Sequence, residues 1–145
     1  MITVFLLFAG AFWESSMDVI GTKHNYEKSI WKRIANYFDD KGMHWFGNKY
    51  WDCSTAWSNK WKNNDPEQGP KFFGSNTFLV YLMDGWHLAK ALWLIHLFLA
   101  IVMYKPITDY WVVDFVVLIS WFGISHEIFF VLLQPKNKVN NKKNS

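Results

Sequence analysis

The sequence predicts an all-α, polytopic membrane protein with three transmembrane helices and an aromatic-rich insertion between the first two. Three long apolar blocks carry this prediction, together with an aromatic content of 20% that includes ten Trp in 145 residues. The mean hydropathy of −0.04 averages these blocks with a polar middle. A chain of this size predicts one compact unit. The single Cys excludes an intramolecular disulfide framework and a multi-Cys zinc site.

The predicted spans cover about residues 1–20, 76–104 and 108–134, in one membrane domain of residues 1–134. About 20 helical residues cross a hydrocarbon core, so the second and third spans suffice. The first span is marginal, because its purely apolar run ends at Trp13. A cleaved signal peptide is disfavoured, since no Lys or Arg precedes Lys23. A soluble globule is disfavoured because it would have to bury two helices that are apolar nearly all round.

Loop charge predicts the orientation. Nine Lys and Arg residues lie between the first two apolar blocks and four Lys follow the third, whereas the short connection between the last two spans holds only Lys105. The positive-inside rule then places the N-terminus outside and the insertion and C-terminus in the cytoplasm. We expect an integral protein of a bacterial inner membrane.

The insertion, residues 21–75, is expected to lie in the cytoplasm or at the membrane interface. The segment 26–40 reads as one amphipathic helix that ends before Gly42, lying either on lipid headgroups or against the rest of the domain. Residues 43–75 read as irregular. Trp and Lys alternate in them, which favours contact with membrane lipids; these Trp are Trp45, Trp51, Trp57 and Trp61. Nucleic-acid binding is disfavoured by the net charge of only +3. Residues 135–145 read as a disordered basic tail.

Nine ionisable residues fall within the apolar blocks, where each charge is expensive. With the predicted orientation, seven of them share one cytoplasm-facing layer: Glu14, Asp18, Asp84, His87, Lys90, His126 and Glu127. Glu14 and Asp18 share a helix face through i,i+4 spacing, and Asp84 and His87 do so through i,i+3 spacing. Only His96 and Asp114 lie toward the outer side.

Carboxylates and imidazoles from several helices are how helical bundles build metal sites. We therefore predict Asp84, His87 and His126 as ligands of a divalent metal such as Zn, Mn or Fe, with Glu14, Asp18 and Glu127 as catalytic groups. Two alternatives stay open. The same groups could form a proton network without metal, or they could be helix-end residues at headgroup level, paired with Lys.

Two classes of function follow. The first is an enzyme that acts on a lipid or lipid-linked substrate, and it is metal-dependent if the predicted ligands hold a metal. The alternative is a non-enzymatic oligomeric component, either pore-forming and holin-like or an accessory subunit, with a homo-oligomer as its expected assembly. Ion movement along His96 and Asp114 is a further alternative. No phosphate-binding Gly-rich loop, nucleophile elbow or paired-Cys motif is present.

The run from Trp45 to His87 carries a resemblance. Its characteristic stretches are Trp51-Asp52, the segment 57–62, Gly69-Pro70-Lys71-Phe72, Gly74-Ser75 and the segment 84–87. They resemble uncharacterised small membrane proteins of Bacteroidetes-type bacteria and their phages. The resemblance implies that the polar middle and the segment 84–87 belong to one unit, and it implies no reaction.

Overall fold

The computed structural model describes residues 1–134, so the tail predicted to be disordered lies outside the described residues. Within that range the chain forms helices and turns and no strand, apart from an isolated bridge between Trp61 and Pro70. The all-α prediction is confirmed.

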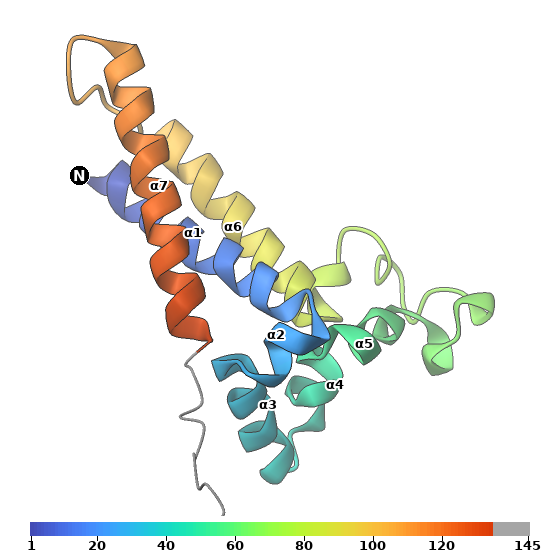
Figure 1. The fold of residues 1–145 in the computed structure, drawn as a ribbon. Helices are drawn as coiled ribbons and strands as arrows, with labels where there is room; N and C mark the ends of the chain where they lie inside the picture. Colours follow the sequence, from blue (N-terminus) through green and yellow to red (C-terminus); the bar gives the residue numbers. More distant parts are fainter. Residues whose placement is uncertain (135–145) are drawn as a thin grey trace, which may run out of the picture.

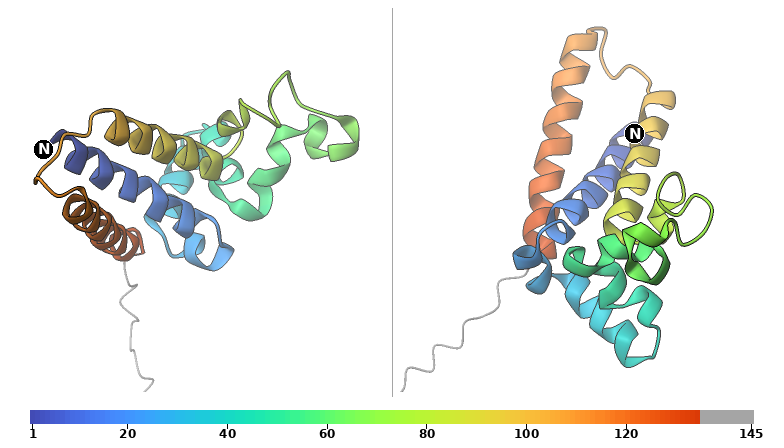
Figure 2. Two further views of the ribbon diagram at one scale, coloured as in Figure 1. Left: turned by 90° about the horizontal axis from the view of Figure 1, so that it is seen from above. Right: turned by 90° about the vertical axis from the view of Figure 1, so that its right-hand side faces the viewer.

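Three helices are long and apolar enough to cross a membrane: α1 (Ile2–Ile20), α6 (Gly85–Val102) and α7 (Trp111–Leu133). Figures 1 and 2 show α1 lying between α6 and α7. Side-chain hydrogen bonds connect α1 to both neighbours. The Thr3 hydroxyl donates to the carbonyl of Met103 over 3.2 Å, and the indole N–H of Trp121 donates to the carbonyl of Val4 over 3.2 Å.

The second predicted span began too early. Instead of starting near residue 76, α6 starts at Gly85, and the preceding residues form turns and the short helix η5 (Val80–Leu82). Asp84 causes this start. Its backbone is extended and its carboxylate accepts the backbone N–H of His87 over 2.8 Å, which is the geometry of a helix N-cap.

The single helix predicted for residues 26–40 is in fact two helices, α2 (Lys23–Glu27) and α3 (Ile30–Asp40). The break occurs because Ser29 acts as the N-cap of α3, with its hydroxyl oxygen accepting the backbone N–H of Lys32 over 3.2 Å. The end of α3 is as predicted. Gly42 has a left-handed φ of 74°, which lets Met43 N–H reach the carbonyl of Phe38.

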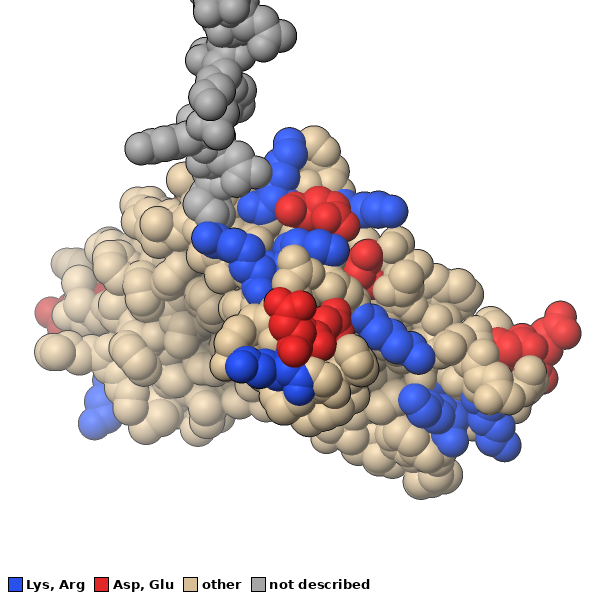
Figure 3. Space-filling view, turned by 90° about the horizontal axis from the view of Figure 1, so that it is seen from below, with Lys and Arg blue, Asp and Glu red and all other residues tan. Residues whose placement is uncertain are grey.

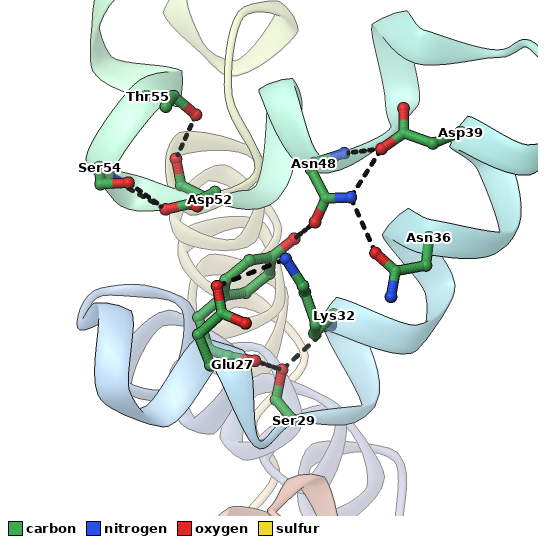
Figure 4. A network of polar contacts seen from close by, with 10 residues as sticks. Glu27, Ser29, Lys32, Asn36, Asp39, Asn48, Asp52, Ser54 and Thr55 are labelled. Carbon is green, nitrogen blue, oxygen red and sulfur yellow. Dashed lines mark hydrogen bonds and ion pairs between the residues drawn. The ribbon is translucent and has the colours of Figure 1, made fainter.

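The rest of the insertion is a chain of one-turn helices, none longer than four residues: η1 (His44–Phe46), α4 (Asn48–Trp51), α5 (Cys53–Ala56), η2 (Trp57–Lys60), η3 (Lys62–Asn64) and η4 (Pro66–Gln68). Polar side chains connect α4 to α2 and α3 (Figure 4). Asn48 donates through its amide group to Asn36 and Asp39 and accepts the hydroxyl hydrogen of Tyr26. The insertion is therefore a folded unit despite its short elements.

The largest buried cluster lies where the insertion meets the ends of the long helices, and it includes Val19, Ile20, Tyr26 and Leu133. The Trp31 and Trp51 rings stack there, with centroids 4.5 Å apart. Trp51 was predicted to lie at the membrane interface, and this is wrong, because only 2% of it is exposed. Trp31 is buried in the same cluster. The helix α3 therefore packs against the rest of the domain through the face that carries Trp31.

Charged side chains are distributed unevenly between the insertion and the long helices. Figure 3 shows the charged side chains gathered mainly over the insertion, whereas the surface of the long helices in this view is nearly bare of charge. Trp45 and Trp57 of the insertion are 72% and 53% exposed, consistent with their predicted interfacial position.

Candidate functional site

The first turn of α6 holds a carboxylate–imidazole pair. His87 Nδ1 lies 2.7 Å from Asp84 Oδ2 and 2.9 Å from Asp84 Oδ1. Asp84 is 3% exposed, whereas the His87 side chain is 31% exposed. A carboxylate at Nδ1 favours the neutral tautomer with its proton on that nitrogen. Nε2 is then left with a free lone pair, and among residues 1–134 it has no hydrogen-bond partner.

A cavity of about 210 Å³ borders this pair. Its walls come from the end of α1, the start of α6 and the insertion, and its other lining residues are Ile20, Gly21, Tyr50, Trp51, Cys53, Ala56, Trp57 and Trp86. The insertion, residues 21–75, therefore supplies six of the ten lining residues.

Hydrogen bonds from side chains to backbone carbonyls hold the insertion against the Asp84–His87 pair. The amide group of Asn59 donates to the carbonyls of Lys49 and Met83, over 2.6 and 3.0 Å. The Tyr50 hydroxyl donates to the carbonyl of Tyr81 over 2.8 Å, and burial raises the pKa of this phenol. Together these bonds hold the segment 81–83, which leads into Asp84, against the insertion.

Two other lining residues carry a polar group. The indole N–H of Trp51 is buried and has no acceptor among the described residues. Burial, with the nearby carboxylate of Asp52, raises the pKa of the Cys53 thiol. Because a thiolate is the reactive form, the raised pKa favours a protonated, unreactive Cys53.

A second pair joins α1 to α7. His126 Nε2 lies 3.1 Å from Asp18 Oδ2, and His126 Nδ1 lies 3.7 Å from Glu127 Oε1. The hydroxyl of Ser15 also donates to the carbonyl of His126 over 2.8 Å. The side chains of Asp18 and Glu127 are 55% and 76% exposed, so this pair is more open than the first.

The six predicted site residues thus do not form one cluster. Asp84 pairs with His87, and Asp18 and Glu127 lie beside His126, while Glu14 lies one turn before Asp18 on α1. Within the described part of the chain, no three His, Cys, Asp or Glu side chains are close enough together to hold a metal ion. The predicted metal therefore has no donor set of three side chains there.

His96 and Asp114, which lie toward the far end of the bundle, have local partners. His96 Nδ1 lies 2.7 Å from the carbonyl of Leu92, one turn earlier in its own helix. The Asp114 carboxylate accepts hydrogen bonds from Tyr104, Ile107 and Thr108 in the loop between α6 and α7. These local hydrogen bonds account for the presence of both polar side chains in the bundle, without an ion path.

Sequence reasoning found the Asp84–His87 pair through its i,i+3 spacing but missed the residues that make the cavity. Tyr50 carried no signal beyond the general richness in aromatics, and Trp51 and Trp86 stood in the stretches that carry the resemblance. Comparisons with known proteins add nothing to this site, because no family model, curated protein or solved structure matches the chain.

Proposed function

We propose that this chain is an integral membrane protein in which His87, oriented by Asp84, acts as a general acid and base on a lipid or lipid-linked substrate. In this proposal α1, α6 and α7 span the membrane, with the N-terminus outside and the insertion in the cytoplasm. Their length and apolar character support it, as do the nine Lys and Arg between the first two apolar blocks.

The observation that carries the chemistry is the 2.7 Å contact from His87 Nδ1 to the buried Asp84 carboxylate, at the wall of a cavity. Nε2 takes a proton from an attacking water or hydroxyl group, and the Asp84 carboxylate stabilises the imidazolium that forms. His87 then returns the proton to the leaving group. Proton transfer of this kind contributes about 10²–10⁴-fold in rate.

The substrate class follows from the position of the cavity. Ile20, Trp57 and Trp86 are among its lining residues, so it lies where the apolar helices meet the insertion. In a membrane this is the headgroup level, which a lipid reaches without leaving the bilayer.

The test is reconstitution into liposomes of phosphatidylethanolamine and phosphatidylglycerol, followed by mass spectrometry of the lipids. We expect a headgroup or acyl-transfer product with the wild type and with the control His24→Gln, whose imidazole contacts Lys28 on the insertion surface. His87→Gln should lose the product at least 100-fold. Equal product from His87→Gln and wild type would overturn the assignment, as would a wild type that leaves these lipids unchanged.

One observation favours the second candidate, an oligomeric membrane component. Ser120, Gly123 and Glu127 are all exposed and share one face of α7, and a Cβ built on Gly123 would meet nothing within 4 Å. Small residues let helices approach closely, and a carboxylate facing lipid is costly. Disulfide crosslinking of Ser120→Cys in membranes tests this candidate. It predicts a crosslinked dimer that Leu132→Cys, which is exposed on a different face of α7, forms less well, and equal crosslinking at both positions would contradict it.

A further inference from the structure

A second, larger hollow lies in the half of the helix bundle that faces away from the insertion. It has a volume of about 470 Å³ and is formed by α1, α6 and α7. Figure 2 (right) shows the arrangement: α6 and α7 stand apart, α1 crosses between them, and the loop 103–110 joins α6 to α7 at the far end. We call this hollow the outer groove.

The walls of the outer groove are almost entirely apolar. Leu97 and Ile101 from α6 face Phe115, Leu118 and Phe122 from α7, and Leu7 of α1 lies between the two helices. The two lining hydroxyls are already engaged: Thr3 donates to the carbonyl of Met103, and Tyr104 donates to Asp114. The occupant that suits such walls is a hydrocarbon.

The length and volume of the outer groove limit which apolar group can occupy it. On α7 the lining runs from Trp111 to Phe122, which is roughly 16 Å of helix at about 1.5 Å per residue. A helix with its side chains is about 10–12 Å across and fills roughly 1,300–1,900 Å³ over the same length. The hollow holds about 470 Å³, so a transmembrane helix of another chain does not fit inside. A single hydrocarbon chain does.

Charge at the rim indicates what the hydrocarbon chain is attached to. Lys105 follows the lining residue Tyr104 and is exposed, and it is the only Lys or Arg from Ala91 to Gln134. The nearby Asp114 carboxylate is 1% exposed and already accepts four hydrogen bonds. An exposed ammonium at the end of an apolar groove complements a phosphate.

We propose that the outer groove holds one acyl chain of a membrane phospholipid, with the phosphate of that lipid beside Lys105. The inference rests on the membrane insertion in the proposed function but not on the chemistry at His87. The groove lies toward the opposite end of α6 from His87, so this lipid is a bound component of the fold rather than the substrate.

The test uses the full chain purified in a mild detergent and measured by native mass spectrometry. We expect a single phospholipid to stay bound to the wild type. Leu118→Trp fills the groove and should lose that lipid. Leu132→Trp, on the same helix but 58% exposed and outside the groove, should keep it. Lys105→Gln should lower retention several-fold. A lipid retained equally by Leu118→Trp and Leu132→Trp would overturn the proposal, as would a wild type that retains none.

A crosslinking arm identifies the occupant independently. A phosphatidylglycerol with a diazirine at the end of one acyl chain is activated in liposomes that contain the protein. Adducts on the segment 115–122 and on Leu97 or Ile101 are expected, and they should be weaker in Leu118→Trp. Crosslinks from the groove to a second copy of the chain, or adducts spread evenly over α6 and α7, would contradict the proposal.

Two controls keep the failures apart. Circular dichroism of Leu118→Trp shows whether the variant is folded, and Leu97→Trp provides a second filling variant if it is not. His87→Gln should retain the phospholipid while losing the product of the proposed reaction. Extraction of membranes at alkaline pH tests insertion separately. A chain released by that treatment would remove both proposals, whereas loss of the groove lipid alone leaves the chemistry at His87 standing.

Discussion

His87 Nδ1 lies 2.7 Å from Oδ2 of Asp84, and the same carboxylate accepts the backbone N–H of His87 at the start of α6. Asp84 therefore has two roles at once. As an N-cap it sets where the helix begins, and as a partner of the imidazole it fixes which nitrogen carries the proton. A substitution that preserves the first role and alters the second separates structure from chemistry.

The two roles predict different behaviour for two substitutions. Asp84→Ala removes the cap and should lower the free energy of unfolding by about 1 kcal/mol. Asp84→Asn keeps an oxygen that accepts the His87 N–H, so it should retain most of that stability. Thermal unfolding in detergent, followed by circular dichroism, compares the two. If Asn is as destabilising as Ala, the carboxylate contributes through its charge and the capping role is refuted.

Gly85 predicts a packing effect at the same place. A Cβ at this position would overlap the ring of Trp51, which is buried and cannot move away freely. Gly85→Ala should therefore lower the free energy of unfolding by about 1–3 kcal/mol. Gly123→Ala is the matched control, because it lies inside α7 with open space around it, and it should raise stability by about 0.5–1 kcal/mol. Equal effects at both glycines would show that the insertion does not pack on α6 as described.

The long helices were the most predictable part of the fold, because an unbroken apolar run and its length are visible in one sequence. The start of α6 was not. Residues 78–83 are as apolar as the helix that follows, and only the backbone geometry at Asp84 shows that the helix begins after them. Ser29 breaks the segment 26–40 for a similar reason, since a capping Ser looks the same as a helical Ser in the sequence.

Only the local part of the candidate site was predictable from the sequence. The pairing of Asp84 with His87 followed from their i,i+3 spacing, whereas the common layer of Asp84, His87 and His126 stays a prediction. Which helix faces meet depends on how α1 packs against α6 and α7, and this separates His126 from the first pair. The burial of Trp51 was also invisible, because Trp is equally suited to an interface and to a core.

Asp114 is expected to hold the loop between α6 and α7. Its carboxylate accepts the backbone N–H groups of Ile107 and Thr108 over 2.8 and 2.9 Å. In Asp114→Ala we expect these two amides to exchange with deuterium at least tenfold faster, because they lose their acceptor. Asp109→Ala, an exposed neighbour on the same loop, should leave their exchange unchanged. Exchange in detergent, read by mass spectrometry, checks both; protection that survives Asp114→Ala would contradict this role.

Asp39 predicts a pH dependence for the insertion. The hydrogen bond from the backbone N–H of Asn48, together with His44, lowers the pKa of this carboxyl below its usual 3.8. A lowered pKa stabilises the fold above 3.8, and that stability is lost as the pH falls through the folded value. The midpoint of thermal unfolding should therefore fall less between pH 5 and pH 3 in Asp39→Asn than in wild type. The matched variant of exposed Asp40, Asp40→Asn, should follow wild type; an Asp39→Asn curve parallel to wild type would refute the coupling.

The most direct test of the account is the protonation of His87, observed by ¹⁵N NMR of the imidazoles in detergent micelles near neutral pH. In the neutral imidazole of His87, Asp84 should keep the proton on Nδ1 and leave Nε2 free. That signature should disappear in Asp84→Ala and persist in the control His24→Gln. A wild-type spectrum with the proton on Nε2, or one that Asp84→Ala leaves unchanged, would show that Asp84 does not prepare His87 for proton transfer, and the proposed chemistry would fall.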